Sequence, residues 1–202
     1  MTKMFLEPDK PLHTCNAENC HDCKLSDKLV CHFNIKQLFG FLLIVSPSFI
    51  IAGIIIIKFN PFLLIPWIVF FLSYFGFVEI RVMCSHCPHY AESEINTLKC
   101  WANYGSLKLW KYRPGPMSLN EKIVFYLGFT IILIYPIIFF IVENNYIFLW
   151  LYFILIALTK LVLNKYYCTH CINFDCPLNH VDEEIRNIFF NKNPGVKDAW
   201  KK

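Results

Sequence analysis

Ten cysteines are the residues of this chain best suited to chemistry, and all of them lie outside its long apolar stretches. Thiolates bind soft metal ions or exchange electrons, so clustered cysteines indicate metal or redox chemistry. The cysteines form three groups: Cys15, Cys20, Cys23 and Cys31, then Cys84, Cys87 and Cys100, and finally Cys168, Cys171 and Cys176.

The first group has enough ligands for a metal ion without help from elsewhere in the chain. Its spacing is C-x4-C-x2-C-x7-C, which places four thiolates within seventeen residues. Four cysteine sulfurs complete the tetrahedral shell that structural zinc prefers. This segment therefore predicts a local four-cysteine site.

The second and third groups each contain three cysteines, two of them in a C-x2-C turn that lets two sulfurs reach one ion. A nearby histidine supplies a fourth ligand in each case: His89 in the second group and His180 in the third. With these histidines every cysteine has a role in one of three separate sites. Histidine-completed sites favour zinc, which is the cofactor that we expect.

Iron-sulfur clusters are the main alternative. The spacing from Cys15 to Cys23 is similar to the opening of plant-type ferredoxin motifs, and Cys176 followed by Pro177 resembles the Cys-Pro that ends bacterial ones. Cys84, Cys87, Cys168 and Cys171 together could hold one shared, all-cysteine centre. Free or redox-active thiols are a third interpretation.

The composition indicates the class of protein to which these cysteine groups belong. The chain has 202 residues, of which 56% are hydrophobic and only 17% charged, whereas a soluble domain has about a quarter charged residues. Four apolar runs account for the excess, and each approaches the roughly 20 residues that cross a bilayer. We predict an all-α integral membrane protein, in contact with lipid, whose spans are Leu38–Ile57, Phe62–Val78, Ile123–Val142 and Tyr146–Leu163.

Short connections join the first span to the second and the third to the fourth, which predicts two tight hairpins. The predicted order is a cysteine-rich N-terminal segment (1–37), hairpin 1 (38–80), a cysteine-containing loop (81–122), hairpin 2 (123–163) and a cysteine-rich tail (164–202). Both termini and the loop then share one side, which carries seventeen of the nineteen lysines and arginines. The positive-inside rule makes that side cytoplasmic, where thiols stay reduced and structural disulfides are rare.

The two halves also resemble each other. An offset of 84 residues aligns 62–87 with 146–171, including Cys-Ser-His-Cys with Cys-Thr-His-Cys. This match predicts two duplicated hairpins related by a pseudo-twofold axis along the membrane normal.

Local patterns predict three further features of the polar segments. Residues 91–103 have the pattern of a helix ended by Gly105, and Ser118 with Glu121 forms a capping box before the third span. In the tail, Val181, Ile185 and Ile188 recur at helical spacing.

These features together predict a membrane-anchored metal-binding protein whose cytoplasmic cap, ordered by its metal sites, docks a protein partner. The alternative is a membrane-bound iron-sulfur or thiol redox protein, in which case the protein would be an oxidoreductase or an electron-transfer subunit. Motifs for nucleotide binding, serine hydrolysis or metalloprotease chemistry are missing from the sequence. The sequence therefore identifies no catalytic residue, and it shows no arginine-rich groove for nucleic acid.

Overall fold

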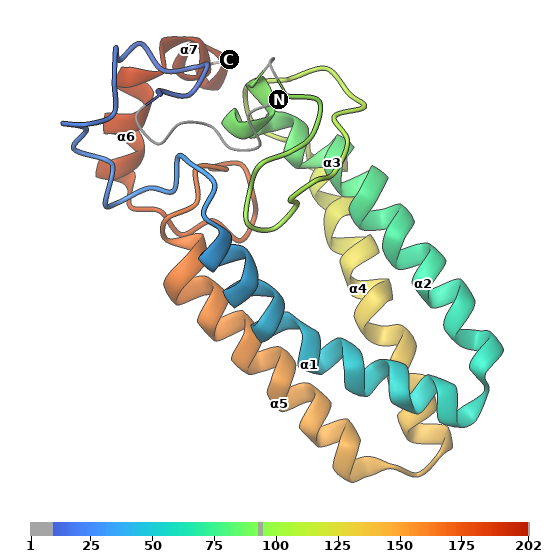
Figure 1. Cartoon of the computed structure of the whole chain (residues 1–202). Helices are drawn as coiled ribbons and strands as arrows, with labels where there is room; N and C mark the ends of the chain where they lie inside the picture. Colours follow the sequence, from blue (N-terminus) through green and yellow to red (C-terminus); the bar gives the residue numbers. More distant parts are fainter. Residues whose placement is uncertain (1–9, 93–94, 202) are drawn as a thin grey trace, which may run out of the picture.

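The computed structural model describes residues 10–92 and 95–201, and it places four long apolar helices beside a cap of loops and short helices (Figure 1). Each of the four is long and apolar enough to cross a membrane. The prediction of four membrane-spanning helices is therefore confirmed by length and composition. The first span is α1 (Ile35–Phe59), the third is α4 (Leu119–Val142), and the fourth is α5 (Tyr146–Val162) continued by the π-helix η5 (Leu163–Cys168). Among the described residues no strand forms; only isolated β-bridges occur.

The second span is longer than the sequence predicts. It begins with a 3-10 turn, η1 (Pro61–Leu63), and continues through α2 (Leu64–Ser73), the π-helix η2 (Tyr74–Val78) and α3 (Glu79–Val82). Two 3-10 turns follow, η3 (Cys84–His86) and η4 (Pro88–Ala91). The C-x2-C turn of Cys84 and Cys87 therefore lies directly at the end of the second span. Cys168 lies at the end of η5 in the same way.

The helices pack mainly between the two predicted hairpins and less within them. In Figure 1, α1 runs beside α5 and α2 runs beside α4. Two side-chain hydrogen bonds join the second span to α4: Trp67 Nε1 donates to the Ile132 carbonyl oxygen (3.1 Å), and the Tyr74 hydroxyl donates to that of Phe125 (2.5 Å). The short connections are as predicted, and both of these hydrogen bonds link a helix of one hairpin to a helix of the other.

The capping box predicted before the third span is confirmed. The Ser118 hydroxyl accepts a hydrogen bond from the Glu121 backbone amide, and the Glu121 carboxylate accepts one from the Ser118 backbone amide. Two amides that the first turn would leave without partners are thereby satisfied, so α4 begins at Leu119.

One predicted element of the cap is wrong. In the described part of the segment 91–103, which omits 93 and 94, no helix continues beyond η4. Instead the Leu98 amide donates to the Ser106 carbonyl oxygen (2.8 Å), and the Gly105 amide donates back to Leu98 (2.9 Å). The turn is closed by Gly105 at φ +84°, a conformation that suits glycine. Leu98 is 1% exposed, and its burial outweighs the helical preference of this segment.

The tail folds into α6 (Glu183–Lys192) and α7 (Pro194–Trp200), which confirms the predicted helical spacing there. An apolar core, which includes Leu25, Ile172, Phe174, Phe189 and Phe190, holds the tail against the N-terminal segment. Hydrogen bonds add to this contact: the Asn16 amide donates to the Lys192 carbonyl oxygen (2.9 Å), and the Thr14 hydroxyl donates to Asn193 Oδ1 (2.7 Å).

Candidate metal centre

Five cysteines from two distant parts of the chain surround one small pocket in the cap. The pocket has a volume of about 70 Å³, and its lining includes Cys84, Cys87, Cys100, Cys171 and Cys176. We call these five residues the central cysteines. The Cys87 side chain is close enough to interact electrostatically with each of the other four.

Each central cysteine sulfur accepts a hydrogen bond from an amide. For three of them the donor is a backbone amide two residues further along the chain: His89 for Cys87, Asn173 for Cys171 and Leu178 for Cys176.

Asn103 provides the amide donors for the other two central cysteines, Cys100 and Cys84. Its backbone amide lies 3.2 Å from Cys100 Sγ, and its side-chain Nδ2 lies 3.3 Å from Cys84 Sγ and 3.5 Å from Glu79 Oε1. Asn103 is therefore a supporting residue that sequence reasoning missed, because an asparagine three residues after a cysteine carries no distinctive signal. Amide donors of this kind stabilise negative charge on sulfur.

Val30 joins all three cysteine-bearing segments at this pocket. Its backbone amide donates to the His170 carbonyl oxygen (2.8 Å), and it forms a parallel bridge with Cys171. Its carbonyl oxygen accepts a hydrogen bond from the ring of His89. Val30 also lines the pocket and is followed directly by Cys31, so the first cysteine group lies next to the central cysteines.

Burial determines the protonation of these groups. It raises the pKa of Cys100 to about 11 and that of Cys176 to about 12, and it also raises the pKa values of Cys87 and Cys171. Burial lowers the pKa of His89 to about 4. At neutral pH the pocket therefore contains protonated thiols, which are poor nucleophiles, and a neutral imidazole, which is the form that binds metals.

The residues that line the pocket differ from the ligand sets that the sequence predicts. All four members of the second set, Cys84, Cys87, His89 and Cys100, line the pocket. Of the third set, Cys171 and Cys176 line it as well, whereas Cys168 and the exposed His180 are not part of its lining. His180 instead donates its backbone amide to the Cys168 carbonyl oxygen (3.1 Å). The pocket thus brings together cysteines from the second and third sets, for which the sequence predicts separate sites.

The first cysteine group remains local, as its spacing predicts. Cys31 interacts electrostatically with Cys23, Cys20 and Cys15, and burial followed by these neighbours raises its pKa to about 12. Cys15, Cys23 and Cys31 pack against the same apolar core that contains Leu25 and Phe189.

Neither group has the compact arrangement of a preformed metal site: within 10–92 and 95–201, no three His, Cys, Asp or Glu side chains converge closely enough to hold an ion. The cysteines are neighbours, and the structure does not place them at ligand distances. Binding would therefore require the side chains to turn toward a common point.

Comparisons with known proteins supply no family for the chain. It matches no protein-family model, no curated protein and no solved structure.

Proposed function

We propose that this is a membrane-anchored metal-binding protein in which cysteine thiolates hold metal at two places in the cap. One site is formed by the first cysteine group, and the other by the central cysteines, with His89 in reach. The metal orders the cap, and the ordered cap docks a protein partner. The observation that carries this proposal is the gathering of five cysteines from two distant segments, each with an amide donor to its sulfur.

The chemistry of the pocket supports a metal more than a reactive thiol. A structural thiol would need no amide donor, whereas a metal-bound thiolate keeps negative charge that such donors stabilise. Buried cysteines also need access to the solvent for thiol exchange, and Cys84 and Cys87 are only 5% and 7% exposed. Metal binding removes the thiol protons and gives the sulfurs a common partner.

Zinc is the metal that we propose first, since it suits a site whose role is to order a small cap. An iron-sulfur cluster is the second candidate, and one specific observation favours it: the pocket draws its sulfurs from both halves of the chain and leaves His180 outside. That arrangement approaches the shared all-cysteine centre that an iron-sulfur cluster needs. The protein would then transfer electrons at the membrane surface.

We also propose that the halves are duplicates and that the cap is cytoplasmic. A twofold rotation that carries α1 onto α4 also carries α5 onto α2, so it relates the two observed pairs, α1 with α5 and α2 with α4. The cap side contains nearly all of the lysines and arginines, which supports a cytoplasmic orientation.

Metal analysis of the protein, purified in detergent under anaerobic conditions, tests the proposal. We expect zinc bound to the first cysteine group and to the central cysteines, without colour. Iron with acid-labile sulfide and a brown colour would instead establish the second candidate. A protein without stoichiometric metal of either kind would contradict both.

Cys171→Ser and Cys168→Ser form a matched pair, because the two residues are three positions apart and only Cys171 lines the pocket. We expect Cys171→Ser to lose the central metal and Cys168→Ser to keep it. Cys20→Ser should release only the metal of the first group. Equal loss in Cys168→Ser and Cys171→Ser would show that the central cysteines are not the ligand set.

A further inference from the structure

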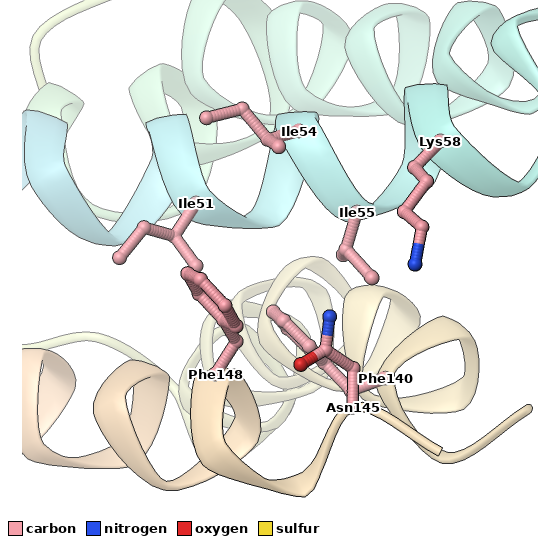
Figure 2. Close-up of a pocket in the computed structure, with 7 residues that line it drawn as sticks. All are labelled: Ile51, Ile54, Ile55, Lys58, Phe140, Asn145 and Phe148. Atoms are coloured by element: carbon pink, nitrogen blue, oxygen red, sulfur yellow. The ribbon is translucent and has the colours of Figure 1, made fainter. Parts of the chain in front are cut away.

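A second cavity lies between the helices at the end of the bundle far from the cap. Its volume is about 290 Å³, and α1, α4, α5 and the α4–α5 turn contribute its lining (Figure 2). The lining residues are Ile51, Ile54, Ile55, Lys58, Phe140, Asn145 and Phe148. The cavity is near the lower end of the size range of small-molecule sites, about 300–1,000 Å³.

The cavity is apolar along most of its length and polar at one end. Ile51, Ile54 and Ile55 lie on one face of α1 together with Lys58, which is in the last turn of the helix. From Ile51 to Lys58 the helix rises by about 10 Å, so a hydrocarbon surface leads directly to an ammonium group. Figure 2 shows the Lys58 side chain directed toward Phe140 and Asn145.

The cavity also opens toward the surroundings of the bundle, since the lining residues Ile54 and Phe148 are 59% and 49% exposed. At that depth the surroundings are acyl chains of a bilayer, and the end of α1 lies where lipid headgroups begin.

Charge identifies the kind of molecule that fits. The Lys58 side chain is 57% exposed, and its ammonium group forms an ion pair with Glu143 (Nζ–Oε2 3.0 Å), whose own side chain is 26% exposed. Asn145 adds an amide at the same end. A lysine ammonium forms charge-assisted hydrogen bonds with phosphate oxygens, and an isoleucine and phenylalanine surface accepts an acyl chain.

We propose that this cavity is a binding site for one glycerophospholipid of the leaflet opposite the cap, with its phosphate at Lys58 and Asn145 and one acyl chain along α1. The bound lipid fills the space between α1 and the α4–α5 turn. This site is independent of the cysteines and of the metal.

Native mass spectrometry of the full chain, titrated with phosphatidylglycerol and in parallel with diacylglycerol, tests the proposal. We expect retention of one phosphatidylglycerol and at least tenfold weaker binding of diacylglycerol, which lacks the phosphate. Lys58→Gln should reduce phosphatidylglycerol binding by about tenfold. Lys160→Gln is the matched control, because Lys160 is in the last turn of α5, at the other end of the bundle, and it should bind like the wild type.

Glu143→Gln separates recognition of phosphate from simple loss of the ion pair. It breaks the same pair but leaves the ammonium group, so we expect phosphatidylglycerol binding to be kept or strengthened. Equal losses in Lys58→Gln and Glu143→Gln would overturn the proposal, as would equal binding in Lys58→Gln and Lys160→Gln. Equal retention of diacylglycerol and phosphatidylglycerol would overturn it as well.

Discussion

The contact between Gly128 of α4 and Tyr74 of η2 gives the sharpest test of how the spans pack. A Cβ atom at position 128 would lie 2.1 Å from Tyr74 Cε2 and 2.3 Å from Cδ2, much closer than carbon atoms can approach. The ring cannot move away freely, because Tyr74 is 2% exposed and its hydroxyl is hydrogen-bonded to the Phe125 carbonyl oxygen. Gly128→Ala must therefore push the second span away from α4.

The expected loss can be estimated from two effects. Overpacking of a well-packed core costs about 1–3 kcal/mol. Displacement of the ring also weakens the Tyr74 hydrogen bond, which contributes about 0.5–1.5 kcal/mol. We expect Gly128→Ala to lower the free energy of unfolding by about 2–4 kcal/mol relative to Gly76→Ala, which is the matched control because no atom lies within 4 Å of its added Cβ.

Reversible unfolding in mixed detergent and dodecyl sulfate micelles, followed by tryptophan fluorescence, measures this difference. A double-mutant cycle strengthens the test. In a Tyr74→Ala background the ring is missing, so Gly128→Ala should no longer destabilise the protein, because a glycine-to-alanine change inside a helix usually stabilises it by about 0.5–1 kcal/mol. If Gly128→Ala unfolds like Gly76→Ala, or if its cost is unchanged in the Tyr74→Ala background, then α4 and the second span do not meet at Gly128 and Tyr74.

Three further predictions concern the ends of the elements and the topology. Ser118→Ala removes the capping box of α4 and should lower the free energy of unfolding by about 0.5–2 kcal/mol in the same assay; an unchanged value would contradict the role of the cap. Asn193→Ala removes the acceptor of the Thr14 hydroxyl, so the N-terminal segment should become sensitive to limited proteolysis while the spans stay protected; equal protection in the variant and the wild type would argue against this contact. A cysteine introduced at Asn60 should react with an impermeant thiol reagent in intact cells, whereas one at Asp27 should react only after permeabilisation; the reverse pattern would invert the orientation.

The sequence by itself determined the four apolar helices and the grouping of cysteines that are close together in the chain. Runs that are apolar on every side bury their backbone polar groups in helices wherever lipid surrounds them, so length and composition suffice to predict them. The capping box and the C-x2-C turns were also predictable, because the groups that interact are only two or three residues apart. For the same reason the first cysteine group could be recognised as one local set.

Only the tertiary structure decided which cysteines meet. Cys168 and Cys171 belong to one short motif, yet Cys171 lines the pocket and Cys168, which ends η5, does not. The distinction depends on how a spanning helix ends and on which loop packs above it, and neither is encoded in the spacing of one segment. Burial of Leu98 likewise replaced the helix predicted for 91–103 by a turn that brings Asn103 to Cys84 and Cys100. Contacts between distant segments, formed to bury apolar surface, therefore fixed the arrangement of the central cysteines.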